Sequence, residues 1–174
     1  MALPSAGEDV VRETKTPWWK GAQGEWYVVV QAVLMLLVLV GPRTLPGGPE
    51  WSLPYVPQRQ VVGAILVAAG GAFFLAGLRR LGSALTPLPY PKEGASLVQT
   101  GPYSLVRHPL YSGGLFASFG FALMVSGWLT FVYVAALFVL LDIKSRQEER
   151  WLSQKFPEYA AYQRRVRKLV PFVY

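Results

Sequence analysis

The chain has 174 residues, of which 52% are hydrophobic and only 16% are charged, well below the roughly 25% usual in soluble proteins. Its long apolar runs predict a single, all-α integral membrane domain. The lack of cysteine excludes disulfides, thiolate nucleophiles and cysteine-ligated metals, and a single histidine excludes a multi-histidine metal site. The net charge of +7 is interpreted as a signal for membrane topology and contact with anionic lipid, not for nucleic acid.

The N-terminal part is predicted to hold two membrane spans over residues 25–78. Residues 1–23 are polar and are predicted to form a cytosolic arm. The first span is predicted at 25–40, where Gly41 and Pro42 follow. The loop 41–60 contains five prolines and is not expected to be helical.

The second span is predicted at 60–78, and small side chains recur along it. Alanine occupies every fourth position, with glycines interspersed, at Ala64, Ala68, Ala72 and Ala76. Residues four apart share one face of a helix, so this stripe predicts the close approach of a neighbouring helix.

Residues 79–173 are predicted to form the functional half. The connection 81–108 is rich in proline and carries Tyr90 and Tyr103. Loops of this length usually have a function, so a lid or a cofactor-lining loop is expected. The third span is predicted at 109–125, because Pro109 suits the first position of a helix.

Ser126 and Gly127 predict a tight break before a fourth span at 128–143. The segment 142–150 is expected to continue that helix into water. Pro157 predicts the start of an amphipathic helix that lies on the membrane surface. One face of this helix is predicted to carry Tyr159, Tyr162, Val166 and Leu169. The cations Arg164, Arg165 and Lys168 lie partly on the opposite face.

The distribution of cations predicts the orientation of the four spans. With the N-terminus inside, fifteen Lys and Arg residues fall on the inner side, against Arg43 and Arg59 outside. This asymmetry predicts that both the N- and the C-terminus are cytosolic.

The third and fourth spans form a predicted hairpin that brings polar residues to one level. His108 and Arg146 each lie nineteen residues from Gly127, which corresponds to roughly 28 Å of helix, close to the hydrocarbon thickness. Arg107 and His108 are therefore expected beside the segment 146–149 at the cytosolic interface. Each of these charged segments can also be explained without a binding site, as an interfacial anchor, a solvated helix end or a topology signal.

Taken together, these side chains suit a zwitterionic cofactor with a positive sulfonium. A cation such as Arg107 or His108 binds a carboxylate, and a glutamate binds an ammonium group or ribose hydroxyls. Aromatic faces attract a sulfonium through cation–π contacts. Methyl transfer requires in-line positioning and water exclusion more than acid–base groups.

The motifs occur in a specific order, which is Gly-Pro-Tyr at 101–103, Arg-His-Pro-Leu-Tyr at 107–111, Glu-Glu at 148–149 with Leu152, Phe156 with Tyr159 and Tyr162, Arg-Val at 165–166 and Pro-Phe-Val at 171–173. In this order the chain resembles the isoprenylcysteine carboxyl methyltransferase family, which is related to membrane phospholipid methyltransferases. The resemblance covers residues 77–173, and the first 60 residues carry none of it.

The resemblance implies S-adenosylmethionine as the methyl donor, bound on the cytosolic side between the last two spans and the C-terminal segment. It implies donor contacts from a set of six residues, Tyr103, Val106, His108, Pro109, Tyr111 and Glu149. It places Arg107 and Glu148 at the reacting centre and pairs Arg165 with an acceptor carboxylate. The acceptor is expected to be a lipophilic molecule from the bilayer, either an isoprenylcysteine-type carboxylate or a lipid group.

Two other functions remain open at the level of sequence. One is a membrane reductase of similar helical layout that uses a nicotinamide cofactor. The other is a non-enzymatic membrane subunit in which the charges only anchor helices. The sequence specifies neither the acceptor nor the oligomeric state.

Overall fold

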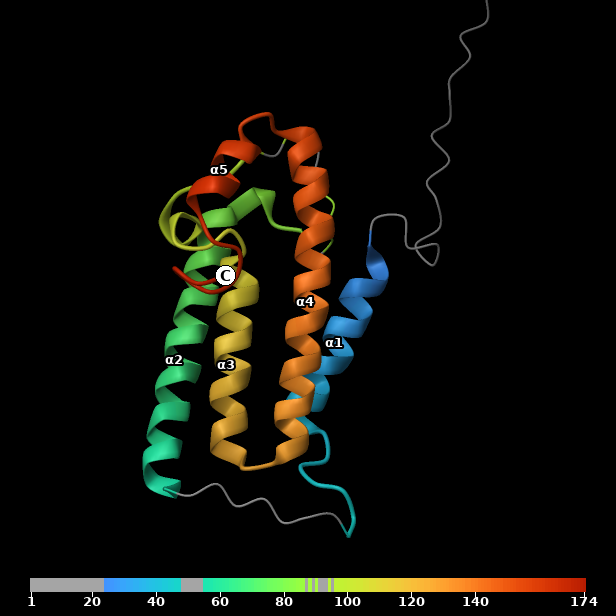
Figure 1. The fold of residues 1–174 in the computed structure, drawn as a ribbon, viewed down its shortest axis with the longest axis vertical. Coiled ribbons are helices and arrows are strands. Elements are labelled where there is room, and N and C mark those ends of the chain that lie inside the picture. Colours follow the sequence, from blue (N-terminus) through green and yellow to red (C-terminus); the bar gives the residue numbers. More distant parts are fainter. Residues whose placement is uncertain (1–23, 48–54, 87, 89, 91–93, 95) are drawn as a thin grey trace, which may run out of the picture.

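The computed structural model describes residues 24–47, 55–86, 88, 90, 94 and 96–174 (Figure 1). Four long helices dominate it, and they are α1 (Glu25–Val40), α2 (Val56–Leu81), α3 (Pro109–Val125) and α4 (Trp128–Lys155). The short elements are η2 (Gly82–Ala84), η3 (Gly101–Ser104) and α5 (Tyr159–Arg165). The regular elements of the described residues are all helices, apart from one isolated β-bridge. The predicted cytosolic arm at 1–23 lies outside them.

The predicted helix boundaries are largely confirmed. Helices α1 and α3 have the predicted limits, and α4 follows the predicted break at Ser126, whose φ of 56° is left-handed. The prediction that α2 starts at residue 60 is wrong, because it starts at Val56. Pro57 falls in its first turn, where the missing N–H of proline is not needed.

Two predictions for the C-terminal part are also wrong in detail. The segment 142–150 continues the helix as predicted, but its first half does not enter water, because Lys144 and Ser145 are buried. The last helix ends at Arg165, so buried Leu169 belongs to the segment after it. Lys168, expected on a polar face, is buried and donates to Asp142 Oδ1 at 2.5 Å.

Helices α2 and α3 pack closely along their glycines. Gly63, Gly70 and Gly77 of α2 are buried, and they are spaced seven residues apart. A Cβ atom added at Gly70 would lie 2.6 Å from the backbone oxygen of Gly113 on α3. The predicted alanine stripe is not this face, because Ala64, Ala68 and Ala72 are exposed. The predicted close approach of a helix is confirmed, but the interspersed glycines, and not the alanines, make the contact.

Two helices of the described chain are long and apolar enough to cross a membrane, at Val56–Ala84 and Trp128–Lys155. In the most apolar 18-residue stretch of each helix, only 17% and 39% is buried. Most of this apolar surface therefore faces outward, unlike that of a core helix in a soluble protein. Helices α1 and α3 are apolar but shorter. Figure 1 shows α1 beside α4 and α2 beside α3, with α5 and the C-terminus at the end of the bundle where α3 begins.

Candidate active site

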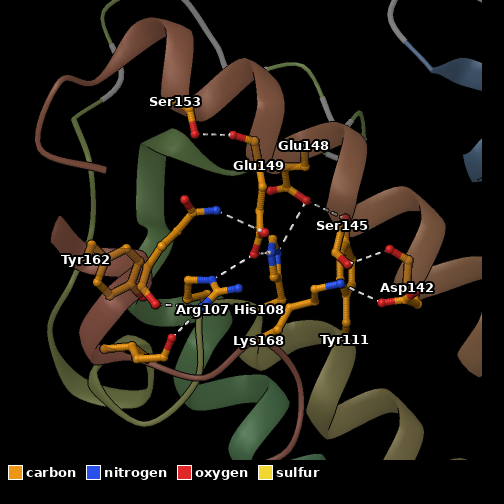
Figure 2. A network of polar contacts seen from close by, with 12 residues as sticks. Arg107, His108, Tyr111, Asp142, Ser145, Glu148, Glu149, Ser153, Tyr162 and Lys168 are labelled. Atoms are coloured by element: carbon orange, nitrogen blue, oxygen red, sulfur yellow. Dashed lines mark hydrogen bonds and ion pairs between the residues drawn. The ribbon is translucent and has the colours of Figure 1, made fainter. Parts of the chain in front are cut away.

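An ion-pair cluster joins the start of α3 to the end of α4 (Figure 2). Arg107 Nε donates to Glu149 Oε1 at 2.7 Å, and His108 Nε2 lies 3.1 Å from the same oxygen. His108 Nδ1 lies 3.5 Å from Glu148 Oε2. The hairpin register predicted from residue counting is therefore confirmed, because both glutamates reach the Arg-His pair.

The C-terminal segment fixes the backbone of this pair. Val106 and Arg167 form a parallel β-bridge. The N–H of Arg107 donates to the carbonyl of Arg167 at 2.8 Å, and that of His108 to the carbonyl of Lys168 at 3.2 Å. One turn further along α3, Ser112 Oγ donates to the carbonyl of Leu169 at 2.6 Å. These bonds hold the segment after α5 across the mouth of α3, where His108 is the N-cap residue and Pro109 the first helical residue.

Arg107 contacts α4, α5 and the residue that follows α5. Besides Glu149, its Nη1 donates to the carbonyl oxygens of Gln163 and Val166. Gln163 Nε2 in turn donates to Glu149 Oε2 at 3.1 Å. Within the described part of the chain, Nη2 of Arg107 makes no hydrogen bond, so this nitrogen remains available to a ligand.

His108 is buried between two carboxylates. Burial lowers its pKa, but Glu148 and Glu149 outweigh that effect, and the pKa of His108 rises above its usual value of 6.5. The imidazole ring stacks on the ring of Tyr111, with centroids 5.3 Å apart and planes 6° apart. Tyr111 donates its hydroxyl to Glu148 Oε2 at 2.9 Å. The cluster therefore favours a protonated imidazolium that donates to both glutamates.

This pKa shift predicts a specific pH dependence of stability. A group whose pKa is raised in the folded state stabilises that state fully below its unfolded pKa, about 6.5, and loses this effect as pH rises through the raised value. We expect the stability difference between the wild type and His108→Gln to shrink as pH rises above about 6.5. Unfolding midpoints in detergent over this range provide the measurement. A difference that grows with pH would contradict the assignment.

A cavity opens beside the cluster, and we refer to it as the polar cavity because Arg107, His108 and Glu148 line it, although most of its wall is apolar. Its chemically relevant lining residues come from η3, the start of α3, the end of α4 and α5, and they are Tyr103, Arg107, His108, Tyr111, Glu148, Phe156, Tyr159 and Tyr162. Its volume is about 120 Å³. This is below the roughly 300–1,000 Å³ of ligand pockets in general, so a nucleoside cofactor would also extend through the mouth of the cavity.

One buried hydroxyl in this cavity lacks a partner. Tyr159 is 1% exposed, and its hydroxyl makes no hydrogen bond to any described residue. The neighbouring Tyr162 is satisfied, because it donates to the carbonyl of Tyr103 at 2.6 Å. Buried polar groups are nearly always hydrogen-bonded, so the Tyr159 hydroxyl is an exception in the wall of this cavity.

The structure gathers most, but not all, of the predicted site residues. Tyr103, Arg107, His108, Pro109, Tyr111 and Glu148 line the polar cavity. Val106 does not, since it is fully buried in the β-bridge. Glu149 lies behind the lining, where it binds Arg107 and His108.

Arg165 also lies outside the cavity. It is exposed, and its Nη2 donates to Gln99 Oε1 at 2.9 Å. Its assignment to an acceptor carboxylate stays a prediction. The sequence motifs include Tyr159 without giving it a role, and the structure adds that it lines the polar cavity.

Comparison with known proteins identifies the family of this arrangement. A family model described as phospholipid methyltransferase matches residues 58–159, which is more than half of the chain. The chain belongs to the phospholipid methyltransferase family. The match runs from α2 to the start of α5 and contains the Arg-His pair and both glutamates. Together with the outward-facing apolar helices, this membership shows a membrane protein and confirms the resemblance found in the sequence.

Individual relatives have diverse names. The chain is 32% identical over 152 residues to the cobalt-zinc-cadmium resistance protein CzcN of Cupriavidus metallidurans, covering 85% of this chain and 62% of that one. It is 28% identical over 194 residues to methanethiol S-methyltransferase 1 of Bradyrhizobium diazoefficiens, covering 99% and 65%. It is 29% identical over 155 residues to protein-S-isoprenylcysteine O-methyltransferase of Saccharomyces cerevisiae, covering 86% and 65%. The chain thus spans less than two thirds of the length of each of these relatives.

Proposed function

We propose that this chain is a membrane methyltransferase that uses S-adenosylmethionine to methylate a lipophilic acceptor at the cytosolic face. The observation that carries the proposal is the composition of the polar cavity. A carboxylate (Glu148), a guanidinium (Arg107) and an unpaired buried hydroxyl (Tyr159) line it together, among aromatic rings. Family membership and the methyltransferase names of two relatives support the same activity.

The residues of the cavity fit the charges of such a donor. Arg107 Nη2 would bind its carboxylate, and Glu148 would bind its ammonium group or ribose hydroxyls. The rings of Tyr103, Tyr111 and Phe156 provide faces for a sulfonium. When bound, the donor supplies an electrophilic methyl group. The work of the protein is then to align the acceptor and to exclude water.

The same proposal includes four membrane spans with both ends in the cytosol. The apolar lengths of α1 and α3, 16 and 17 residues, correspond to roughly 24–26 Å of helix, close to the hydrocarbon thickness. Arg79 and Arg80 end α2 at the same end of the bundle as the Arg-His pair and α5 (Figure 1). Positive residues gathered at one end favour a cytosolic position for that end.

A cofactor panel separates this function from the two others that the sequence left open. We expect S-adenosylmethionine, but not a nicotinamide dinucleotide, to raise the melting temperature of the purified protein. We also expect Tyr159→Phe to weaken donor binding by roughly tenfold without lowering the stability of the ligand-free protein, because the lost hydroxyl has no partner there. Tyr55→Phe is the matched control, since Tyr55 is 74% exposed and precedes α2.

Stabilisation by the nicotinamide instead would favour the reductase. Stabilisation by neither cofactor would favour an inert membrane subunit. Equal donor affinity in Tyr159→Phe and in the wild type would remove Tyr159 from the site.

A further inference from the structure

A hollow lies between α3 and α4, and we refer to it as the lateral groove. Its lining comes from these two helices and from Leu169 and Val170, in the segment that follows α5. Its volume is about 440 Å³, within the range of ligand pockets. Among the described residues, none lines both the groove and the polar cavity. A molecule in the groove would therefore be separate from the methyl donor.

The lateral groove is apolar and opens outward. Ser112 is the one polar residue in its described lining, and its hydroxyl already donates to the carbonyl of Leu169. Phe119 of α3 and Val139 of α4 line the groove and are 43% and 55% exposed. An exposed apolar surface of this kind on membrane helices suits a hydrocarbon chain of the bilayer.

Cations lie at the end of the groove that is nearer to α5. Phe138 lines the groove, and Asp142 and Arg146 follow it at intervals of four residues, so the three share one face of α4. Tyr174 connects them, because its ring lies 6.4 Å from that of Phe138 and its hydroxyl donates to Asp142 Oδ1 at 2.8 Å. Arg146 and Lys168 both pair with the Asp142 carboxylate, and Figure 2 shows the Lys168 pair.

Arg146 is placed to meet the head group of a lipid. Its side chain is 62% exposed, although it pairs with Asp142. The eight residues from Phe138 to Arg146 correspond to roughly 12 Å of helix, so the guanidinium lies beyond the apolar groove. A cation above an apolar groove complements an anionic lipid, which has a charged head group above a hydrocarbon chain.

The groove also contacts the segment that shapes the polar cavity. Leu169 is 1% exposed and lines the groove. The two carbonyls that precede it in the chain accept from the N–H groups of Arg107 and His108. A ligand stabilises the conformation that it binds, so a chain packed against Leu169 would favour the docked position of this segment.

We propose that the lateral groove binds one hydrocarbon chain of an anionic phospholipid whose head group contacts Arg146, and that this lipid holds residues 167–170 against the mouth of α3. The proposal does not depend on methyl transfer, because it assigns a lipid site apart from donor and acceptor. A neutral phospholipid fills the groove equally well but lacks the attraction to Arg146.

Native mass spectrometry without methyl donor tests the groove. The purified protein is released from mixed micelles that contain equal amounts of dioleoylphosphatidylglycerol and dioleoylphosphatidylcholine. We expect the wild type to retain mainly phosphatidylglycerol, and Ala135→Leu to weaken retention by about tenfold, because the larger side chain fills the groove. Ala136→Leu is the matched control, since Ala136 is the next residue of α4 and is exposed outside the lining.

The same experiment tests the head-group contact. Arg146→Gln should lower the preference for phosphatidylglycerol over phosphatidylcholine by about fivefold, the usual effect of one cation near an anionic lipid. Arg79→Gln is the control, because Arg79 is exposed at the end of α2, away from the groove, and it should keep the preference.

Hydrogen exchange tests the link to the segment after α5. The amides of Arg107 and His108 bond to this segment, so we expect them to exchange more slowly in phosphatidylglycerol than in phosphatidylcholine. This difference should disappear in Ala135→Leu and persist in Ala136→Leu. Identical exchange of the wild type in both lipids would overturn the link.

Two results would overturn the lipid site itself. One is equal lipid retention, or equal head-group preference, in the wild type and in the variants of the groove and of Arg146. The other is a lipid-free dimer that Ala135→Leu dissociates, which would show that a second copy of the chain covers this face. If Ala135→Leu fails to fold, Val139→Phe fills the same groove from an exposed position.

Discussion

Replacing Glu149 by alanine is expected to destabilise the protein by about 3 kcal/mol, because the change leaves the guanidinium of Arg107 buried without its carboxylate. Glu149 also binds His108 and Gln163, so it joins α4 to the start of α3 and to α5. Unfolding in mixed micelles with increasing dodecyl sulfate measures the loss.

The matched control for this change is Glu158→Ala. Glu158 precedes α5 and is exposed, so its loss should change stability by no more than about 0.5 kcal/mol. Equal effects of the two substitutions would show that the cluster contributes nothing beyond an ordinary surface charge.

Substitution of Gly70 by alanine is expected to separate α2 from α3 and to destabilise the fold by about 1–3 kcal/mol, the usual effect of overpacking. The added Cβ would lie 2.6 Å from the backbone nitrogen of Ala117 and from the backbone oxygen of Gly113. Backbone atoms cannot move aside as a flexible side chain does, so the helices must part.

Gly71 provides an internal control, since it is the next residue on the same helix. A Cβ added there meets nothing within 4 Å. We therefore expect Gly71→Ala to be neutral or to stabilise α2 by less than about 1 kcal/mol, through helix propensity. Both variants are compared by the same micelle titration. Similar values for Gly70→Ala and Gly71→Ala would show that the glycine contact does not limit the approach of the helices.

The sequence was most informative where local chemistry determines the structure. Pro109 marks the start of α3, because proline suits the first helical position, and Ser126-Gly127 marks the turn before α4, with a left-handed φ of 56° at Ser126. Once these limits are known, the rise per residue brings Arg107 and His108 level with the two glutamates. This is why the core of the candidate site was predictable without coordinates.

The remaining features depend on which face of a helix meets a neighbour. Alanines and glycines form adjacent stripes on α2, and the sequence does not say which stripe faces α3. Lys144 follows the apolar run and has the sequence pattern of a helix leaving the membrane, but α1 covers it. The unpaired hydroxyl of Tyr159 and the exposure of Arg165 are likewise results of tertiary packing.

Titration of the purified protein with S-adenosylmethionine tests the proposed function most directly. Calorimetry in lipid nanodiscs would compare the wild type with Glu148→Gln and with Glu158→Gln, an exposed control. The proposal predicts saturable binding by the wild type and the control, and an affinity at least about tenfold lower in Glu148→Gln. No binding by the wild type, or one affinity shared by all three proteins, would contradict it.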